Sequence, residues 1–197
     1  LGGVSATKVA EFENAQAGAG NGATTSIWYI VAASDIASGS TLAVVFASAI
    51  VAKAATGLRF SRDTSKSIVI DGINSLANDG ADPGSLTTTG AEDVEHLWVR
   101  GIAGETSSAV AMTPTSGWTA FVGSTTAGSG GATNMQVRGE HSISSGTSAT
   151  SDPTVAAFDW ASLLVGFYEV SAGPATSDVP GRGSSARHHR TSSIYRT

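Results

Sequence analysis

Short apolar runs separated by Gly, Ser, Thr and Asp dominate the pattern of this chain. The strongest run is 162–170, SLLVGFYEV, with Asp152-Pro153 upstream and Gly173-Pro174 downstream. A short apolar run between turn-forming residues is typical of a strand buried in a sandwich core. Two shorter runs, 118–122 and 135–138, precede it and are separated by Gly/Ser/Thr-rich spacers. This half of the chain therefore predicts three strands joined by loops.

The first half of the chain carries runs of the same kind, rich in β-branched and aromatic residues. They predict strands at 24–33, 41–51, 58–62, 66–73, 92–102 and 107–112. The Ala-rich continuation of 41–51 to Ala55 would also suit a helix, but its valines and Phe46 favour a strand. Asp71-Gly72, which follows the apolar SIVI, predicts a hairpin turn.

The stretch 74–90 predicts the longest loop of the chain, and long loops in compact domains are often functional. Its Asn78-Asp79-Gly80 and Asp82-Pro83-Gly84 favour turns, because Asx side chains hydrogen-bond their own backbone and Gly accepts positive φ. A calcium site is the alternative for the oxygen-bearing side chains here. Their spacing is not that of an EF-hand, and turn formation explains each of them: Asp71, Asn74, Asn78, Asp79 and Asp82.

These elements predict an all-β fold, a single antiparallel β-sandwich at 23–172. A chain of 197 residues is long enough to bury one such core. Residues 1–22 predict an N-terminal arm that reaches a neighbouring subunit, or a first edge strand followed by a loop. This segment lacks the basic-then-apolar order of a signal peptide. Because the first residue is Leu1, we expect a processed chain or a start at a non-ATG codon.

Composition limits the possible partners. Charged residues make up only 14% of the chain, against about 25% in ordinary soluble domains. A surface so poor in charge favours contact with neighbouring subunits, or solubility supplied by Ser and Thr hydroxyls. The net charge of −5 argues against nucleic acid as a partner. The best apolar run, 41–55, is too short to span a membrane and contains Lys53, and the absence of Cys excludes disulfides.

The segment 173–197 is the one break in composition, and it predicts an extended basic C-terminal tail beyond the domain. From Gly181 onward it has no acidic residue. It is either a solvated terminus or a strap on an acidic surface of another protein, and the apolar Ile194 favours the strap. The side chains predicted to bind that partner are Arg182, Arg187, His188, His189, Arg190, Tyr195 and Arg196.

Motifs for catalysis are scarce. There is no GxSxG elbow, and no histidine lies in a nucleophile arrangement. His96 lies beside Trp98 in a strand pattern, as a surface or hydrogen-bonded core imidazole does. The pair His188-His189 has no further zinc ligands nearby, and 127–133 lacks the Lys-Ser/Thr of a phosphate loop. Neighbouring carboxylates could serve glycoside hydrolysis, but at i and i+2 of a strand they mark a solvated face: Glu11, Glu13, Glu92, Asp93 and Glu95. We therefore predict no enzyme, no cofactor and no metal.

Trp residues leave one binding role open. If Trp98, Trp118 or Trp160 were exposed, each could stack on a sugar ring, as in a carbohydrate-binding module. The competing interpretation, which we favour, is that these side chains fill the core.

The order of motifs in 24–170 carries a resemblance. Gly117-Trp118-Thr119, a strand, a Gly/Ser-rich loop, a strand around Val137 and Ser151-Asp152-Pro153-Thr154 are followed by a small-residue strand that ends in Phe167. This order resembles the β-sandwich structural proteins of tailed bacteriophages. The resemblance implies a jelly-roll-like sandwich and transfers no catalytic residue.

The function that the resemblance implies is that of a non-enzymatic virion protein, most simply a capsid decoration protein that packs on neighbouring subunits through its sandwich and terminal arms. Its expected partners are major capsid or tail proteins and further copies of itself, with neither nucleic acid nor membrane involved. The alternative is a tail-fibre or head-fibre module that recognises host-surface glycans.

Overall fold

Strand β12 (Phe158–Ser171) lies inside the largest sheet of the structure, a computed structural model. The structure describes residues 5–14, 22–41, 43–45, 52–106, 109–126, 134–156 and 158–171. Within these ranges the protein is all-β with antiparallel strand pairs and contains no helix, as the sequence predicts. No described helix could therefore cross a membrane.

The large sheet has the strand order β3-β12-β5-β9-β7, and β8 also pairs with β9. Its long members are β3 (Lys66–Ala81), β5 (Glu95–Glu105) and β9 (Met135–Ser145), while β7 (Thr119–Ala120) and β8 (Ser124–Thr125) are short. From Trp160 to Phe167 every residue of β12 is buried. A strand buried on both faces needs a near-continuous apolar run, and 162–170 supplies one.

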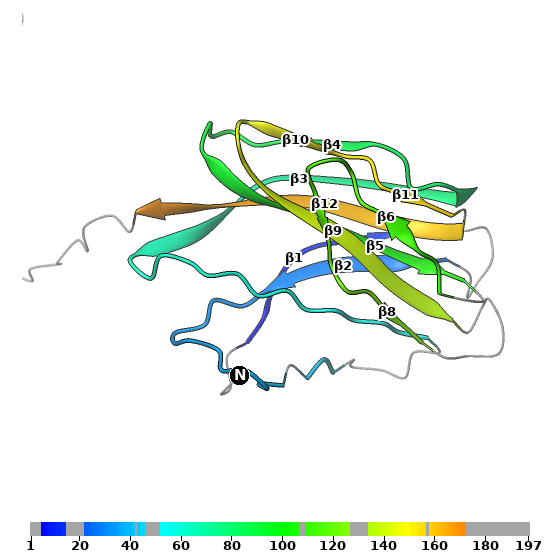
Figure 1. Cartoon of the computed structure of the whole chain (residues 1–197), viewed down its shortest axis with the longest axis horizontal. Helices are drawn as coiled ribbons and strands as arrows, with labels where there is room; N and C mark the ends of the chain where they lie inside the picture. Colours follow the sequence, from blue (N-terminus) through cyan, green and yellow to red (C-terminus); the bar gives the residue numbers. More distant parts are fainter. Residues whose placement is uncertain are drawn as a thin grey trace, which may run out of the picture.

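Smaller sheets cover both faces of the large one (Figure 1). On one side lies the pair β1 (Thr7–Glu13) and β2 (Thr24–Tyr29), with the ring of Tyr29 5.9 Å from that of Phe167. On the other side β4 (Leu86–Thr89) pairs with β10 (Ser148–Ser151), and β6 (Met112–Thr113) pairs with β11 (Thr154–Val155). The result is a layered β-sandwich; its jelly-roll character stays a prediction.

Two tryptophans anchor the core between the large sheet and these upper pairs. Trp98 packs with Leu86 and Leu164, and Trp160 packs with Ile102 and Val155. Trp98 and Ile102 are fully buried. A large aromatic side chain buries about 150–250 Å² of surface, so Trp98 and Trp160 contribute much of the packing between the layers.

Strand β3 is longer than the sequence predicts, because two Asp-Gly pairs form bulges instead of turns. Val165 pairs with Ile73 and Phe167 with Ile70, so β3 has one extra residue at Asp71-Gly72. A second shift of the same kind lies between Asn78 and Ala81. Gly72 has φ +85°, which an L side chain rarely adopts but a bulge accommodates when the residue is Gly.

The predicted hairpin turn at 71–72 is therefore wrong. So is the predicted loop 74–90, because β3 runs to Ala81 and β4 occupies Leu86–Thr89. The Asp-Gly signal is ambiguous, since bulges and turns both need the left-handed glycine.

Other strands differ from prediction mainly in length. β2 and β5 fall largely within 24–33 and 92–102, while of 107–112 only Met112 is in a strand, and 107–108 lie outside the described residues. Residue 42 and residues 46–51 of the predicted strand 41–51 also lie outside them; the rest of that segment is not in a strand, and Val45 is 88% exposed.

The segment 58–62 belongs to none of the described strands, so the predicted strand there is wrong. Side-chain hydrogen bonds hold it and its flank in place, from Arg59 Nη1 to Ile36 O (2.6 Å) and from Thr56 Oγ1 to Val122 O (2.7 Å). Of the N-terminal segment 1–22, the described residues include β1, a strand paired with β2.

Candidate functional site

The seven tail residues predicted to bind a partner lie outside the described residues: Arg182, Arg187, His188, His189, Arg190, Tyr195 and Arg196. Their role in binding a partner therefore stays a prediction.

His96 is a hydrogen-bonded core imidazole, one of the two environments predicted for it. It is fully buried on β5 and stacks on Trp98, with ring centroids 4.5 Å apart. Its Nε2 lies 3.1 Å from Asp71 Oδ2 and its Nδ1 lies 3.0 Å from the carbonyl oxygen of Val94. Both neighbours are acceptors, so both contacts are hydrogen bonds only when both ring nitrogens carry a proton.

Asp71 is held by the same cluster at the first bulge of β3. Its carboxylate accepts hydrogen bonds from the backbone N–H groups of Ala91 (2.8 Å) and Glu92 (3.1 Å). Partial burial alone would raise the pKa of Asp71, but these bonds and the contact with His96 hold that pKa below its ordinary value. Asp71 thus connects the bulge of β3 to His96 on β5 and to the backbone at 91–92. The role of the His96–Asp71 pair is to stabilise the fold.

The oxygen-bearing residues considered for calcium are engaged separately along β3. Asn74 Nδ2 donates to Thr87 O (2.6 Å), and Asp82 Oδ1 accepts from the backbone N–H of Val155 (3.2 Å). Across the described part of the chain, no three His, Cys, Asp or Glu side chains are grouped to hold a metal ion. These two described contacts join Asn74 to β4 and Asp82 to β11, so both side chains link neighbouring segments of the fold.

A buried charged network joins several strands in the described part of the interior, and sequence reasoning missed it. Arg100 of β5 and Glu140 of β9 are cross-strand partners, and both are fully buried. Arg100 donates from Nε to Ser162 Oγ (2.9 Å), from Nη1 to Ser151 O (2.7 Å), and from Nη2 to Pro83 O (2.8 Å). The guanidinium thereby joins β5 and β12 to β10 and to the connection between β3 and β4.

Glu140 completes the network on the β9 side. Its carboxylate accepts from Ser151 Oγ (2.5 Å), Thr115 Oγ1 (2.6 Å) and the Thr115 backbone N–H (2.7 Å). Burial lowers the pKa of Arg100 to about 10, against the opposing effect of carboxylates that include Glu140. Arg100 therefore remains charged at neutral pH, and the network ties the two layers together through satisfied polar groups.

The exposure of the tryptophans decides between the two roles predicted for them, stacking on a sugar and filling the core. Trp98 and Trp160 are 0% and 1% exposed, and Trp118 is partly buried against the Trp98 cluster, so the core interpretation is confirmed. Trp28, which the sequence argument did not single out, is 53% exposed. In a strand, Ser26 and Trp28 lie on one face and Ile27 on the other. This alternation in the sequence could have identified Trp28 as an exposed ring on the same face as a polar residue.

The surroundings of Trp28 are polar. Lys8 Nζ lies 5.6 Å from the centre of the ring and 3.5 Å from Glu11 Oε2, and the indole Nε1 donates to Ser26 Oγ (2.9 Å). Glu11 and Glu13 are exposed on β1, as predicted for a solvated strand face. The outer face of the β1–β2 pair thus presents one aromatic ring among hydrogen-bonding groups.

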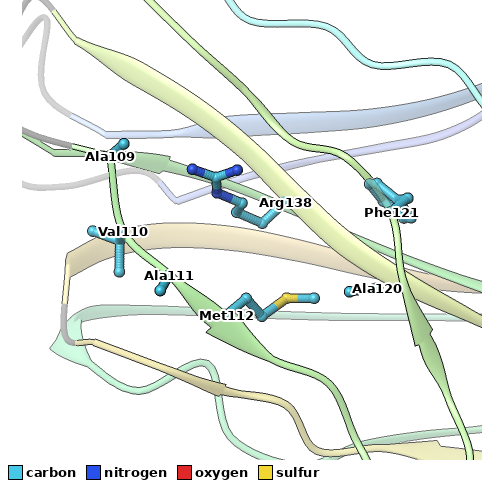
Figure 2. Close-up of a pocket in the computed structure, with 7 residues that line it drawn as sticks. All are labelled: Ala109, Val110, Ala111, Met112, Ala120, Phe121 and Arg138. Carbon is cyan, nitrogen blue, oxygen red and sulfur yellow. The ribbon is translucent and has the colours of Figure 1, made fainter.

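A hollow of about 340 Å³ lies at the other side of the large sheet, beside β9. Figure 2 shows Arg138 between the two chain segments that form the walls of this hollow, one at 109–112 and one at 120–121. The lining is apolar apart from the guanidinium: Ala109, Val110, Ala111, Met112, Ala120, Phe121 and Arg138. Both walls are attached to β9, by hydrogen bonds from Val110 N to Gln136 Oε1 (3.1 Å) and from Phe121 N to Gly139 O (3.0 Å).

The comparisons with known proteins identify no relative. No protein-family model matches this chain, and the searches of curated proteins and of solved structures find no match. The resemblance to bacteriophage sandwich proteins therefore stays a prediction from the sequence.

Proposed function

We propose that this chain is a non-enzymatic structural protein of a bacteriophage virion, a capsid decoration protein that packs on neighbouring subunits. The observation that carries the proposal is the Arg100–Glu140 network. Its buried charges bind side chains and backbone of adjacent layers, so they hold a scaffold together instead of facing a substrate. A rigid small body with this interior suits a part that is repeated in a symmetric array.

The strand edges support packing between copies. Within the described residues β1 pairs with β2 alone, so its other edge carries backbone groups without strand partners. Exposed edges of this kind accept a further strand from a neighbouring chain. The low charge of the sequence favours such contacts, and the predicted C-terminal tail would add interface area to the small body.

Removing 181–197 tests the role of the basic tail. We expect the full-length chain to sediment with purified phage particles, and the shortened chain to bind them at least about tenfold more weakly, because several charge-assisted contacts are lost. The circular dichroism spectrum and the unfolding midpoint should not change. Unaltered particle binding by the shortened chain would rule out the strap.

A second candidate function is glycan recognition on a tail or head fibre, and the exposure of Trp28 favours it. An aromatic ring flanked by Lys8, Glu11 and Ser26 can stack on a sugar and hydrogen-bond its hydroxyl groups. If this function holds, a host-surface oligosaccharide should quench tryptophan fluorescence saturably, and Trp28→Ala should abolish the effect. The matched variant Trp118→Phe should retain it, since Trp118 packs against the core.

A further inference from the structure

The guanidinium of Arg138 differs from that of Arg100 in its hydrogen bonding. Its Nε is buried without a hydrogen-bond partner, and Arg138 takes part in none of the ion pairs present among the described residues. Arg100, by contrast, directs all three nitrogens to oxygen acceptors. A buried donor left unpaired destabilises the folded protein, and more so when it is charged.

A second unpaired donor lies on the same face of β9. Gln136 is fully buried, its Oε1 accepts from the backbone N–H of Val110, and its Nε2 has no partner. Residues at i and i+2 of a strand point the same way, so Arg138 and Gln136 both present donors on the side of β9 where Val110 lies. These two donors lack a hydrogen-bond acceptor, and an anionic acceptor would suit the charge of Arg138 best.

The size and lining of the hollow limit the size and charge of a ligand that could supply that acceptor. Its volume of about 340 Å³ is at the lower end of the range for small-molecule pockets, about 300–1,000 Å³. Apolar side chains such as Met112 and Phe121 would cover an apolar body. With one cation in an apolar lining, a monoanion is neutralised, whereas a dianionic phosphate would keep an uncompensated charge.

We propose that this hollow binds a small apolar monocarboxylate, whose carboxylate pairs with Arg138 and whose apolar body lies between the Val110–Met112 and Ala120–Phe121 walls. Arginine presents a planar fork of donors that matches a carboxylate. The attachment of both walls to β9 leaves the site largely formed before the ligand arrives. The proposal stands independently of a role in the virion.

The test uses the full-length protein, with 3-phenylpropionate as the probe and its neutral amide as the matched ligand. We expect saturable binding of the acid by calorimetry, and binding of the amide at least about tenfold weaker, because a hydrogen bond to a charged group contributes about 1.5–3 kcal/mol. Arg138→Met should weaken binding of the acid by a similar factor. Arg62→Met removes a positive charge at the start of β3, which β12 and β5 separate from β9 in the sheet, and it should leave binding unchanged.

A filling variant tests the hollow without altering its charge. Ala120 is exposed on the short strand β7 and lines the hollow, so Ala120→Leu should occupy the space while leaving the core intact. It should weaken binding of the acid, with an unchanged unfolding midpoint. The proposal is overturned if the wild type does not bind the acid saturably, if acid and amide bind equally, or if neither Arg138→Met nor Ala120→Leu weakens binding.

Discussion

Replacing Arg100 by methionine is expected to lower the free energy of unfolding by about 3–5 kcal/mol, the cost of leaving a buried charge uncompensated. Methionine fills a similar volume but donates no hydrogen bond. The substitution leaves the carbonyl oxygens of Pro83 and Ser151 without their donor, and it removes the opposite charge from beside buried Glu140. Denaturation in guanidinium chloride, followed by circular dichroism, measures the loss.

The matched control is Arg62→Met. Arg62 donates to the backbone oxygens of Asp63 and Lys66 at the partly exposed start of β3, so we expect a change within about 0.5 kcal/mol. Adding Glu140→Gln to Arg100→Met should recover part of the loss, because it removes the unpaired charge. A loss below about 1 kcal/mol for Arg100→Met would contradict the role assigned to the network.

Gly166→Ala is expected to destabilise the protein by about 3 kcal/mol, at the upper end of the usual cost of overpacking a core. A Cβ at Gly166 would lie 2.8 Å from Trp98 Cε3, and closer still to Trp98 Cζ3 and to the backbone oxygen of Asp71. Neither neighbour can move easily, since Trp98 is fully buried and Asp71 is fixed by His96 and by the 91–92 backbone. The thermal unfolding midpoint should fall by many degrees.

Gly101→Ala is the control for this substitution. Gly101 lies on the neighbouring strand β5, and a Cβ there would be 3.7 Å from Ile27 Cγ1 and from Thr25 Oγ1, which is ordinary contact. We expect a midpoint equal to or slightly above that of the wild type, because alanine reduces the freedom of the unfolded chain. Equal destabilisation by the two alanines would show that the close approach at Gly166 is not what matters.

Local pattern sufficed for the strands that carry their own apolar signal. β12, β5 and β2 were predicted from runs such as SLLVGFYEV, and the all-β class followed from them. β3 was predicted at half its length. Asp71-Gly72 satisfies a turn and a bulge equally well, and the choice depends on pairing with β12, about ninety positions later in the chain. Long-range pairing of this kind is not visible in a local window.

The interior site was harder to predict for the same reason. Arg100 and Glu140 each stand in a strand pattern, and nothing in the sequence shows that they are cross-strand partners or that Ser151 lies between them. For His96 the sequence left a surface and a hydrogen-bonded core environment open, and the structure shows the core environment. The hollow at Arg138 combines residues from three segments, so only the fold reveals it.

Quantitative mass spectrometry of gradient-purified phage particles tests the central claim most directly. On the proposed function a phage encodes this chain, and the particles should come from cells infected with that phage. A decoration protein occupies equivalent positions in a symmetric shell, so we predict a fixed ratio of this chain to the major capsid protein that further purification does not change. A chain that is missing from the particles, or whose ratio falls steadily with each purification step, would contradict the account.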